Sequence, residues 1–238
     1  MNFHDKVVLV TGGTGGLGRE VTMAFLEAGA RVVVTYLAAE EFAAVEAAAE
    51  KIGAKPPTGV SVDVTDEQAV KNFITEIVAR HGRLDILVNT VGGYAGGTTV
   101  WESDLRTYDK MMNLNLKAGF VLARAIVPQM ITQNRGWIVN IASKAAFDHA
   151  AGGSLYAASK AGALALMDSL AAEVKPHNIN VNSILPSIID TAANRKAMPN
   201  ADCSRWPKPQ EIAQVILFLC SEEARLIHGA AIPVYGRT

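Results

Sequence analysis

Seven short runs rich in valine and isoleucine, spread along the whole chain, are the feature that most restricts its fold. Each run is too short for a helix and apolar on both faces, which is typical of a strand buried on both sides. Longer segments with helical periodicity separate the runs. The expected strands are Val7–Val10, Arg31–Thr35, Gly59–Val62, Leu84–Val88, Trp137–Ile141, Asn180–Ile184 and Ala231–Val234, and the expected helices are Leu17–Ala28, Glu40–Lys51, Asp66–Arg80, Leu105–Thr132, Leu155–Val174 and Pro209–Ser221.

This alternation predicts an α/β fold, a doubly wound parallel sheet of about seven strands with helices on both faces. The 238 residues contain neither a linker nor an internal repeat, so we expect a single domain over residues 1–238. With 22 basic and 23 acidic side chains and no basic run, the chain is a poor partner for nucleic acid or an anionic membrane. The expected ligand is therefore a small molecule.

Two cysteines, Cys203 and Cys220, are too few for a disulfide scaffold, and no His or Cys spacing indicates a metal site. No apolar stretch approaches the length needed to cross a bilayer. These features favour reduced thiols and a cytoplasmic protein.

A glycine-rich turn joins the first expected strand to the first expected helix. Glycine lets the backbone approach a pyrophosphate closely, and the free N–H groups of the helix start attract its charge. The order of strand, turn and helix predicts a dinucleotide site. Its candidate residues are Thr11, Gly12, Thr14, Gly15, Gly16, Leu17 and Gly18.

The end of the second expected strand bears on which dinucleotide binds. A carboxylate there would bind the 2′-hydroxyl of the adenosine ribose and repel a 2′-phosphate. The chain has Thr35, Tyr36 and Leu37 at this place, with neither an acid nor a base. The sequence therefore allows NAD or NADP and slightly favours NADP.

Tyr156 and Lys160 lie four residues apart in an expected helix and so project from one face. A phenol has a pKa near 10, and an adjacent ammonium would lower it towards the range useful for proton transfer. An ordinary surface contact is the competing interpretation. Ser143, at the end of the strand Trp137–Ile141, favours an active site, because ligands bind where strands of such a sheet end.

Together these residues resemble the short-chain dehydrogenase/reductase family. Its TGxxxGxG turn is matched by Thr11, Gly12, Gly16 and Gly18, and its Ser–Tyr–Lys spacing by Ser143, Tyr156 and Lys160. The resemblance covers nearly the whole chain. It implies a Rossmann-type sheet and an NAD(P)-dependent oxidoreductase that moves a hydride between the nicotinamide and a small carbonyl compound or secondary alcohol.

The resemblance also implies a role for each active-site residue. Tyr156 would be the general acid/base, Ser143 would orient the reacting oxygen, and Lys160 would lower the tyrosine pKa and bind the nicotinamide ribose. Asn115 would interrupt a helix and link the proton relay to solvent, with Asn113 as the competing candidate. Further coenzyme contacts are implied at Asp63, Val64, Asn89, Val91, Gly92, Pro186, Ile189 and Thr191, beside Tyr36, Tyr156 and Lys160.

The residues over the substrate leave alternatives open. The segment 190–207 is expected to form a short flap, and with residues 91–97 it is similar to the dihydropteridine reductase branch, which characteristically lacks the serine found at Ser143. Reduction of 3-oxoacyl groups on acyl carrier protein is less favoured, because Asn134 and Ala172 stand where that activity uses basic residues. A non-catalytic dinucleotide sensor is a further alternative. By resemblance, the helices 105–132 and 155–174 would form a homodimer or homotetramer.

Overall fold

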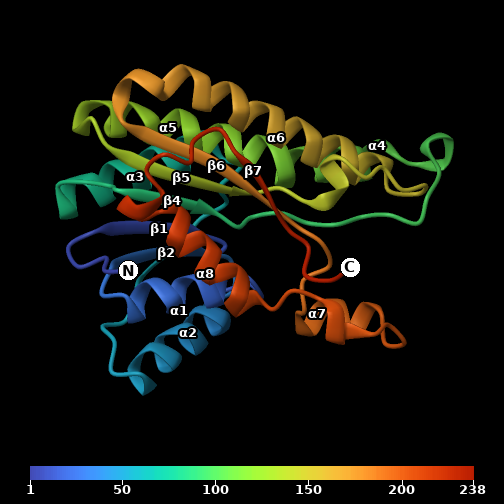
Figure 1. Cartoon of the computed structure of the whole chain (residues 1–238), viewed down its shortest axis with the longest axis horizontal. Helices are drawn as coiled ribbons and strands as arrows, with labels where there is room; N and C mark the ends of the chain where they lie inside the picture. The colour runs from blue at the N-terminus through green and yellow to red at the C-terminus, as the bar shows by residue number, and fades with distance from the viewer.

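The computed structural model describes all residues, 1–238, and its strands form one sheet. All seven strands are parallel and run in the order β3-β2-β1-β4-β5-β6-β7 (Figure 1), so the predicted Rossmann-type sheet is confirmed. The strands are β1 (Val7–Thr11), β2 (Arg31–Tyr36), β3 (Thr58–Ser61), β4 (Ile86–Asn89), β5 (Gly136–Ile141), β6 (Ile179–Pro186) and β7 (Ala231–Val234).

Helices cover both faces of the sheet (Figure 1). On one face lie α1 (Gly18–Glu27), α2 (Ala39–Lys51) and α8 (Pro209–Leu219); on the other lie α3 (Glu67–His81), α5 (Ala118–Gln133) and α6 (Ser154–Val174). Strand β1 shows why its sequence is apolar throughout. Val8 and Val10 pack into the core beneath α1 and α8, whereas Val7 and Leu9 pack into the core beneath α3, α5 and α6.

The prediction of one continuous helix over Leu105–Thr132 is wrong, because the segment is interrupted. It divides into α4 (Leu105–Met112), a π-helical turn over Asn113–Lys117, and α5. A π-helical turn widens the backbone by one residue and often marks a functional site. Periodicity alone did not indicate this break, although the family resemblance implied an interruption at an asparagine.

The segment expected to be a flap is partly helical. It contains α7 (Ala192–Ala197) and a 3₁₀ turn over Cys203–Arg205, and α7 projects beyond the end of the sheet (Figure 1). Its base is fixed, because the Asp190 N–H donates to the Pro207 carbonyl at 3.0 Å. None of the helices combines the length and the apolar character that spanning a bilayer requires.

Candidate active site

The predicted site residues gather where the strands end, on both sides of the point at which the strand order reverses between β1 and β4. In a doubly wound sheet the connections leave β1 and β4 towards opposite faces, which opens a crevice at their carboxyl ends. The glycine turn follows β1, Gly92 follows β4 and Ser143 follows β5. The crevice is therefore lined by three segments that are far apart in sequence.

The glycine turn is held in place by neighbouring side chains. The Gly12 N–H donates to Thr35 Oγ1 at 2.9 Å, and Thr22 Oγ1 donates to the Gly13 carbonyl at 3.1 Å. The turn and α1 also touch at Gly18, where an added Cβ would lie 2.1 Å from the Gly12 carbonyl oxygen. No side chain fits that contact, so glycine at position 18 is required by packing.

The start of α1 fits the pyrophosphate of a dinucleotide. No side chain caps the helix at Leu17, and the N–H groups of Gly16, Leu17 and Gly18 donate to no acceptor within the chain. Free N–H groups at a helix start form an anion site. An added Cβ at Gly16 would lie 2.9 Å from the Thr191 methyl group, so Thr191 forms the opposite wall of a narrow cradle.

Two residues expected to contact the coenzyme are instead directed into the sheet. Thr11 and Asn89 are buried, and Thr11 Oγ1 donates to Asn89 Oδ1 at 2.8 Å. The other end of the Asn89 amide donates to Asn140 Oδ1 at 3.0 Å. These side chains join three neighbouring strands in register, which leaves only their backbones for a ligand.

The adenosine end of the crevice contains a carboxylate that sequence reasoning missed. Tyr36 ends β2, and its ring stacks on Phe42 in α2 with centroids 4.8 Å apart. The next residue towards the helix start, Glu41, accepts a hydrogen bond from Thr14 Oγ1 at 2.9 Å. The sequence-based preference for NADP assumed an uncharged strand end, and that assumption is incomplete. Glu41 belongs to the helix after the strand, so the residues at the strand end gave no signal.

Asp63 and Val64 follow β3, as expected. Asp63 is exposed, and its Oδ1 accepts from the Thr65 backbone N–H and hydroxyl, both at 2.8 Å. Val64 is buried in the core with α3. Val91 packs on the glycine turn, since an added Cβ at Gly12 would meet its methyl group at 3.2 Å. Asp63 thus stays exposed after β3, and Val91 lies against the glycine turn.

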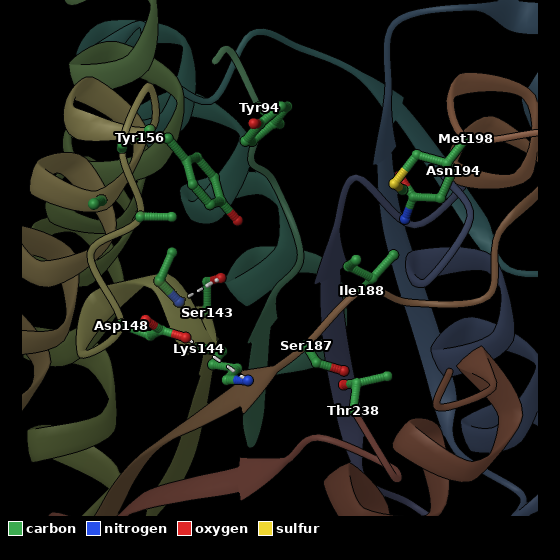
Figure 2. A pocket seen from close by; sticks show the side chains of 15 residues that line it. Tyr94, Ser143, Lys144, Asp148, Tyr156, Ser187, Ile188, Asn194, Met198 and Thr238 are labelled. Carbon is green, nitrogen blue, oxygen red and sulfur yellow. Dashed lines mark hydrogen bonds and ion pairs between the residues drawn. The ribbon is translucent and has the colours of Figure 1, made fainter. Parts of the chain in front are cut away.

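Ser143 and Tyr156 line a pocket of about 480 Å³, and Figure 2 shows the Tyr156 hydroxyl directed into it. Ser143 Oγ accepts a hydrogen bond from the Ala145 N–H at 3.1 Å, which fixes the oxygen and leaves its proton free to donate. The pocket is also lined by Tyr94, Asn194 and Met198, which come from the two segments expected over the substrate. Lys144, Asp148 and Ile188 line it too, and sequence reasoning gave them no role.

The pKa of Tyr156 differs from the expected direction. Burial raises the pKa of this phenol, a hydrogen bond with Ser143 opposes the rise, and Tyr94 adds to it. Lys160 is not among the groups that shift this pKa, and desolvation disfavours the phenolate more than the Ser143 hydrogen bond stabilises it, so the net shift is upward. The Tyr94 ring meets the Tyr156 ring edge-on with centroids 5.0 Å apart, so it contributes to that burial.

Lys160 belongs to α6, and its side chain is buried near the end of β5, with 4% of the residue surface exposed. Its ammonium donates to the Ile141 carbonyl at 2.8 Å, and burial lowers the pKa of this amine to about 8. An added Cβ at Gly92 would lie 3.1 Å from Lys160 Nζ. A larger residue at position 92 would therefore press on this amine.

Asn115, rather than Asn113, is the asparagine brought into the site. It is buried in the π-helical turn, whereas Asn113 is exposed. Its Oδ1 accepts from the Gly93 N–H at 2.9 Å, and its Nδ2 donates to the Gly93 carbonyl and to Ser159 Oγ, each at 3.0 Å. The side chain thereby ties the loop after β4 to α6, the helix that carries Tyr156 and Lys160.

The expected nicotinamide segment follows β6. Pro186 is the last residue of that strand, the Ile189 carbonyl accepts from Asn194 Nδ2 at 2.8 Å, and Thr191 Oγ1 caps α7 by accepting from the Asn194 N–H at 3.2 Å. Asn194 thus fixes the Ile189 carbonyl and the Thr191 hydroxyl oxygen by hydrogen bonds. The Thr191 proton and the Ile189 N–H are the groups left to donate to a carboxamide.

Comparisons with known proteins agree with this geometry. The family model for short chain dehydrogenase matches residues 6–202. The chain is 34% identical to the 3-oxoacyl-[acyl-carrier-protein] reductase of Thermotoga maritima, over 99% of this chain and 98% of the other. It is 33% identical to the 7alpha-hydroxysteroid dehydrogenase of Bacteroides fragilis, over 98% and 94%. Levodione reductase has a similar crystal structure, with a TM-score of 0.91, 28% identity, and coverage of 99% and 98%.

Proposed function

Because the chain belongs to the short-chain dehydrogenase family and is an NAD(P)-dependent oxidoreductase, we propose that Tyr156 is its general acid/base and that its substrate is a small carbonyl compound or secondary alcohol. The observation that carries the proposal is the Tyr156 hydroxyl, which points into the pocket beside Ser143 (Figure 2). The nicotinamide supplies or accepts the hydride when the dinucleotide is bound.

The proton would come from Tyr156 in reduction. Burial raises the pKa of this phenol, so it holds its proton at neutral pH and can donate to a carbonyl oxygen as negative charge develops there. Ser143 would donate a second hydrogen bond to the same oxygen, since its own lone pair is engaged by Ala145. In oxidation the phenol must first lose its proton, so alcohol oxidation is expected to rise with pH.

Lys160 and Asn115 would support the acid/base without touching the reacting carbon. The Lys160 amine, at the end of β5, would bind the ribose hydroxyls next to the nicotinamide and return protons to Tyr156. Because its pKa is about 8, it can give up a proton near neutral pH at little cost. Asn115 would keep Gly92 and Gly93 against α6 and so hold this amine at the crevice.

The pocket supports a compact substrate. Its volume of about 480 Å³ is near the lower end of the range for small-molecule sites. Tyr94, Ile188 and Met198 offer apolar contacts, while Lys144 and Asp148 form an ion pair of 3.7 Å on another wall. A ketone with one polar end would contact both walls. The mixed lining does not favour a long acyl chain or a polymer.

The test is a panel of ketones, aldehydes, quinonoid pterins and alcohols, assayed by nicotinamide absorbance with each coenzyme. Turnover of the pterin would instead favour the dihydropteridine reductase alternative. With the best substrate, Tyr156→Phe is expected to lower kcat by about 10²- to 10⁴-fold while the Kd for the dinucleotide stays within about threefold of wild type.

Tyr108→Phe is the matched control, because it removes the same hydroxyl from an exposed position on α4. It should retain wild-type turnover. Retained turnover in Tyr156→Phe would rule out the proposed acid/base.

We further propose a homodimer or homotetramer formed through α5 and α6. The outward side of α6 carries the small exposed residues Ala158 and Ala165, and Phe120 on α5 is 47% exposed. Small residues let helices of two subunits pack closely.

Cys203 and Cys220 are both free thiols, which supports the cytoplasm as the proposed compartment.

A further inference from the structure

A carboxylate lies beside the glycine turn although the end of β2 is uncharged. Thr14, between Gly12 and Gly16 in the turn, donates its hydroxyl proton to Glu41 Oε2 at 2.9 Å. The hydrogen bond is at the surface, and the second oxygen of the Glu41 carboxylate has no partner within the chain. An acceptor is therefore available at the mouth of the crevice.

The backbone that carries Glu41 is fixed by its neighbour Phe42. The Phe42 ring stacks on Tyr36 at an interplanar angle of 9°, and it also packs against Gly59 in β3. An added Cβ at Gly59 would lie 2.4 Å from the ring, so no larger residue fits there. This packing attaches the first turn of α2 to the ends of β2 and β3, and Glu41 is held next to the turn rather than left on a mobile loop.

The adenosine ribose of a bound dinucleotide would lie between these groups. The free N–H groups of Gly16, Leu17 and Gly18 place the pyrophosphate at the start of α1. In dinucleotide-binding folds, an acidic residue about 20 positions beyond the turn accepts from the ribose 2′-hydroxyl. Glu41 lies 23 positions beyond Gly18 (41 − 18) and is in contact with the turn, so it is placed for that role from the helix instead of the strand.

A 2′-phosphate at this place would meet unfavourable charge. It carries a charge of about −1.5 to −2, whereas Gly15, Tyr36 and Leu37, which border the position, carry none. Arg19 is the nearby basic residue in sequence, and it forms no ion pair with Glu41. The carboxylate is therefore not neutralised within the chain.

We propose that Glu41, positioned by Phe42 and hydrogen-bonded to Thr14, selects NAD(H) over NADP(H). The inference rests on the proposed function, because it assumes that the crevice binds a nicotinamide dinucleotide. It reverses the slight preference for NADP(H) that the uncharged end of β2 had suggested.

Direct binding tests the inference without a substrate. The Kd values of NADH and NADPH are measured by calorimetry on the wild type, on Glu41→Gln and on Glu50→Gln. Glu41→Gln keeps an acceptor for Thr14 but removes the charge. Glu50→Gln makes the same charge change nine residues along α2, about 13 Å away, and is the matched control.

The wild type is expected to bind NADH at least about tenfold more tightly than NADPH. In Glu41→Gln that ratio should fall by about tenfold to a hundredfold, mainly because NADPH binds better, and in Glu50→Gln it should not change. Equal binding of the two dinucleotides by the wild type, or an unchanged ratio in Glu41→Gln, would overturn the inference.

A second measurement uses only the wild-type protein. AMP should displace NADH at a lower concentration than adenosine 2′,5′-bisphosphate, which differs from AMP only by its 2′-phosphate, if Glu41 repels that phosphate, and the opposite order would contradict the inference. A crevice that does not bind a nicotinamide dinucleotide gives a different result, because neither dinucleotide would then bind to any of the three proteins, and failure of Tyr156 as the acid/base would show only in turnover.

Discussion

Replacing Lys160 with methionine separates the energetic cost of burying an amine from its use in the site. The unfolded chain exposes this lysine with a pKa near 10.5, whereas burial in the folded protein lowers that pKa to about 8. A lowering of this size corresponds to roughly 3 kcal/mol of lost stability whenever the amine is protonated in both states. Methionine fills a similar volume without a charge and avoids that cost.

Part of the gain is offset by a lost hydrogen bond. Lys160 donates to the Ile141 carbonyl at 2.8 Å, and leaving that buried acceptor without this donor costs about 1–2 kcal/mol. The net expectation at pH 7 is that Lys160→Met raises the free energy of unfolding by about 1–2 kcal/mol. For a chain of this length, that corresponds to a rise in Tm of about 2–8 °C.

The pH dependence provides the sharper test. Below pH 8 the amine is protonated in both states, and the wild type bears the full cost. Between about 8 and 10.5 the unfolded wild type binds more protons than the folded wild type, so its stability rises with pH. The variant lacks this titration. Its advantage over the wild type should therefore shrink across this interval and then change sign, because only the lost hydrogen bond remains.

The measurement is thermal unfolding of the ligand-free protein from pH 6.5 to 10.5, followed by circular dichroism. Lys51→Met, at the exposed end of α2, is the control and should shift stability by less than about 0.5 kcal/mol at any pH. A stability difference between Lys160→Met and wild type that does not vary with pH would refute the reasoning. A variant that is both more stable and inactive would identify the amine as a functional group held at an energetic cost.

Two further predictions follow from contacts at the site, and a third follows from the proposed subunit interface. Gly18→Ala should destabilise the protein by about 1–3 kcal/mol and lower dinucleotide affinity, since its Cβ would lie 2.1 Å from the Gly12 carbonyl; Gly15→Ala, with 3.5 Å of clearance, should match the wild type in Tm. Asn115→Ala should lower kcat by at least about tenfold and Tm by several degrees, because the Gly93 backbone loses both its partners, and a normal kcat would contradict this positioning role. Light scattering should give two or four subunits, and a stable monomer would exclude the proposed α5–α6 interface.

The strands and most of the helices could be predicted because their signals are local. Four apolar residues in succession indicate that strand β1 is buried on both faces. The glycine turn can be recognised from the few residues that follow this strand. The same reasoning failed within residues 105–132. The buried positions Met111, Asn115, Ala118 and Leu122 keep a helical spacing across the π-helical turn, so periodicity continues through Asn115 and the break is not visible.

The features of the site that sequence reasoning did not indicate have a different origin, because they depend on contacts between distant segments. Asn89 ends a strand, as a ligand-binding residue often does, yet the register of β1, β4 and β5 places it between Thr11 and Asn140. Glu41 is bonded to Thr14 of the turn, and its neighbour Phe42 packs on Gly59, a residue of another strand. The spacing of residues in the sequence predicts which side chains lie on the same face of a helix or strand. It does not predict which residues of other elements pack against that face.

The distribution of internal hydrogen bonds indicates which parts of this site can vary. Asn115 is bonded to Gly93 and Ser159, and Lys160 to Ile141, so the groups that would hold the coenzyme and move the proton are fixed from within the protein. Met198 and Tyr94, by contrast, line the pocket from segments that follow the strands. A change at Asn115 or Lys160 therefore disturbs the fold and the chemistry together, whereas a change at Met198 alters mainly the shape of the pocket. Substrate choice within this architecture should accordingly be set by the loop after β4 and the segment around α7, while the acid/base chemistry stays the same.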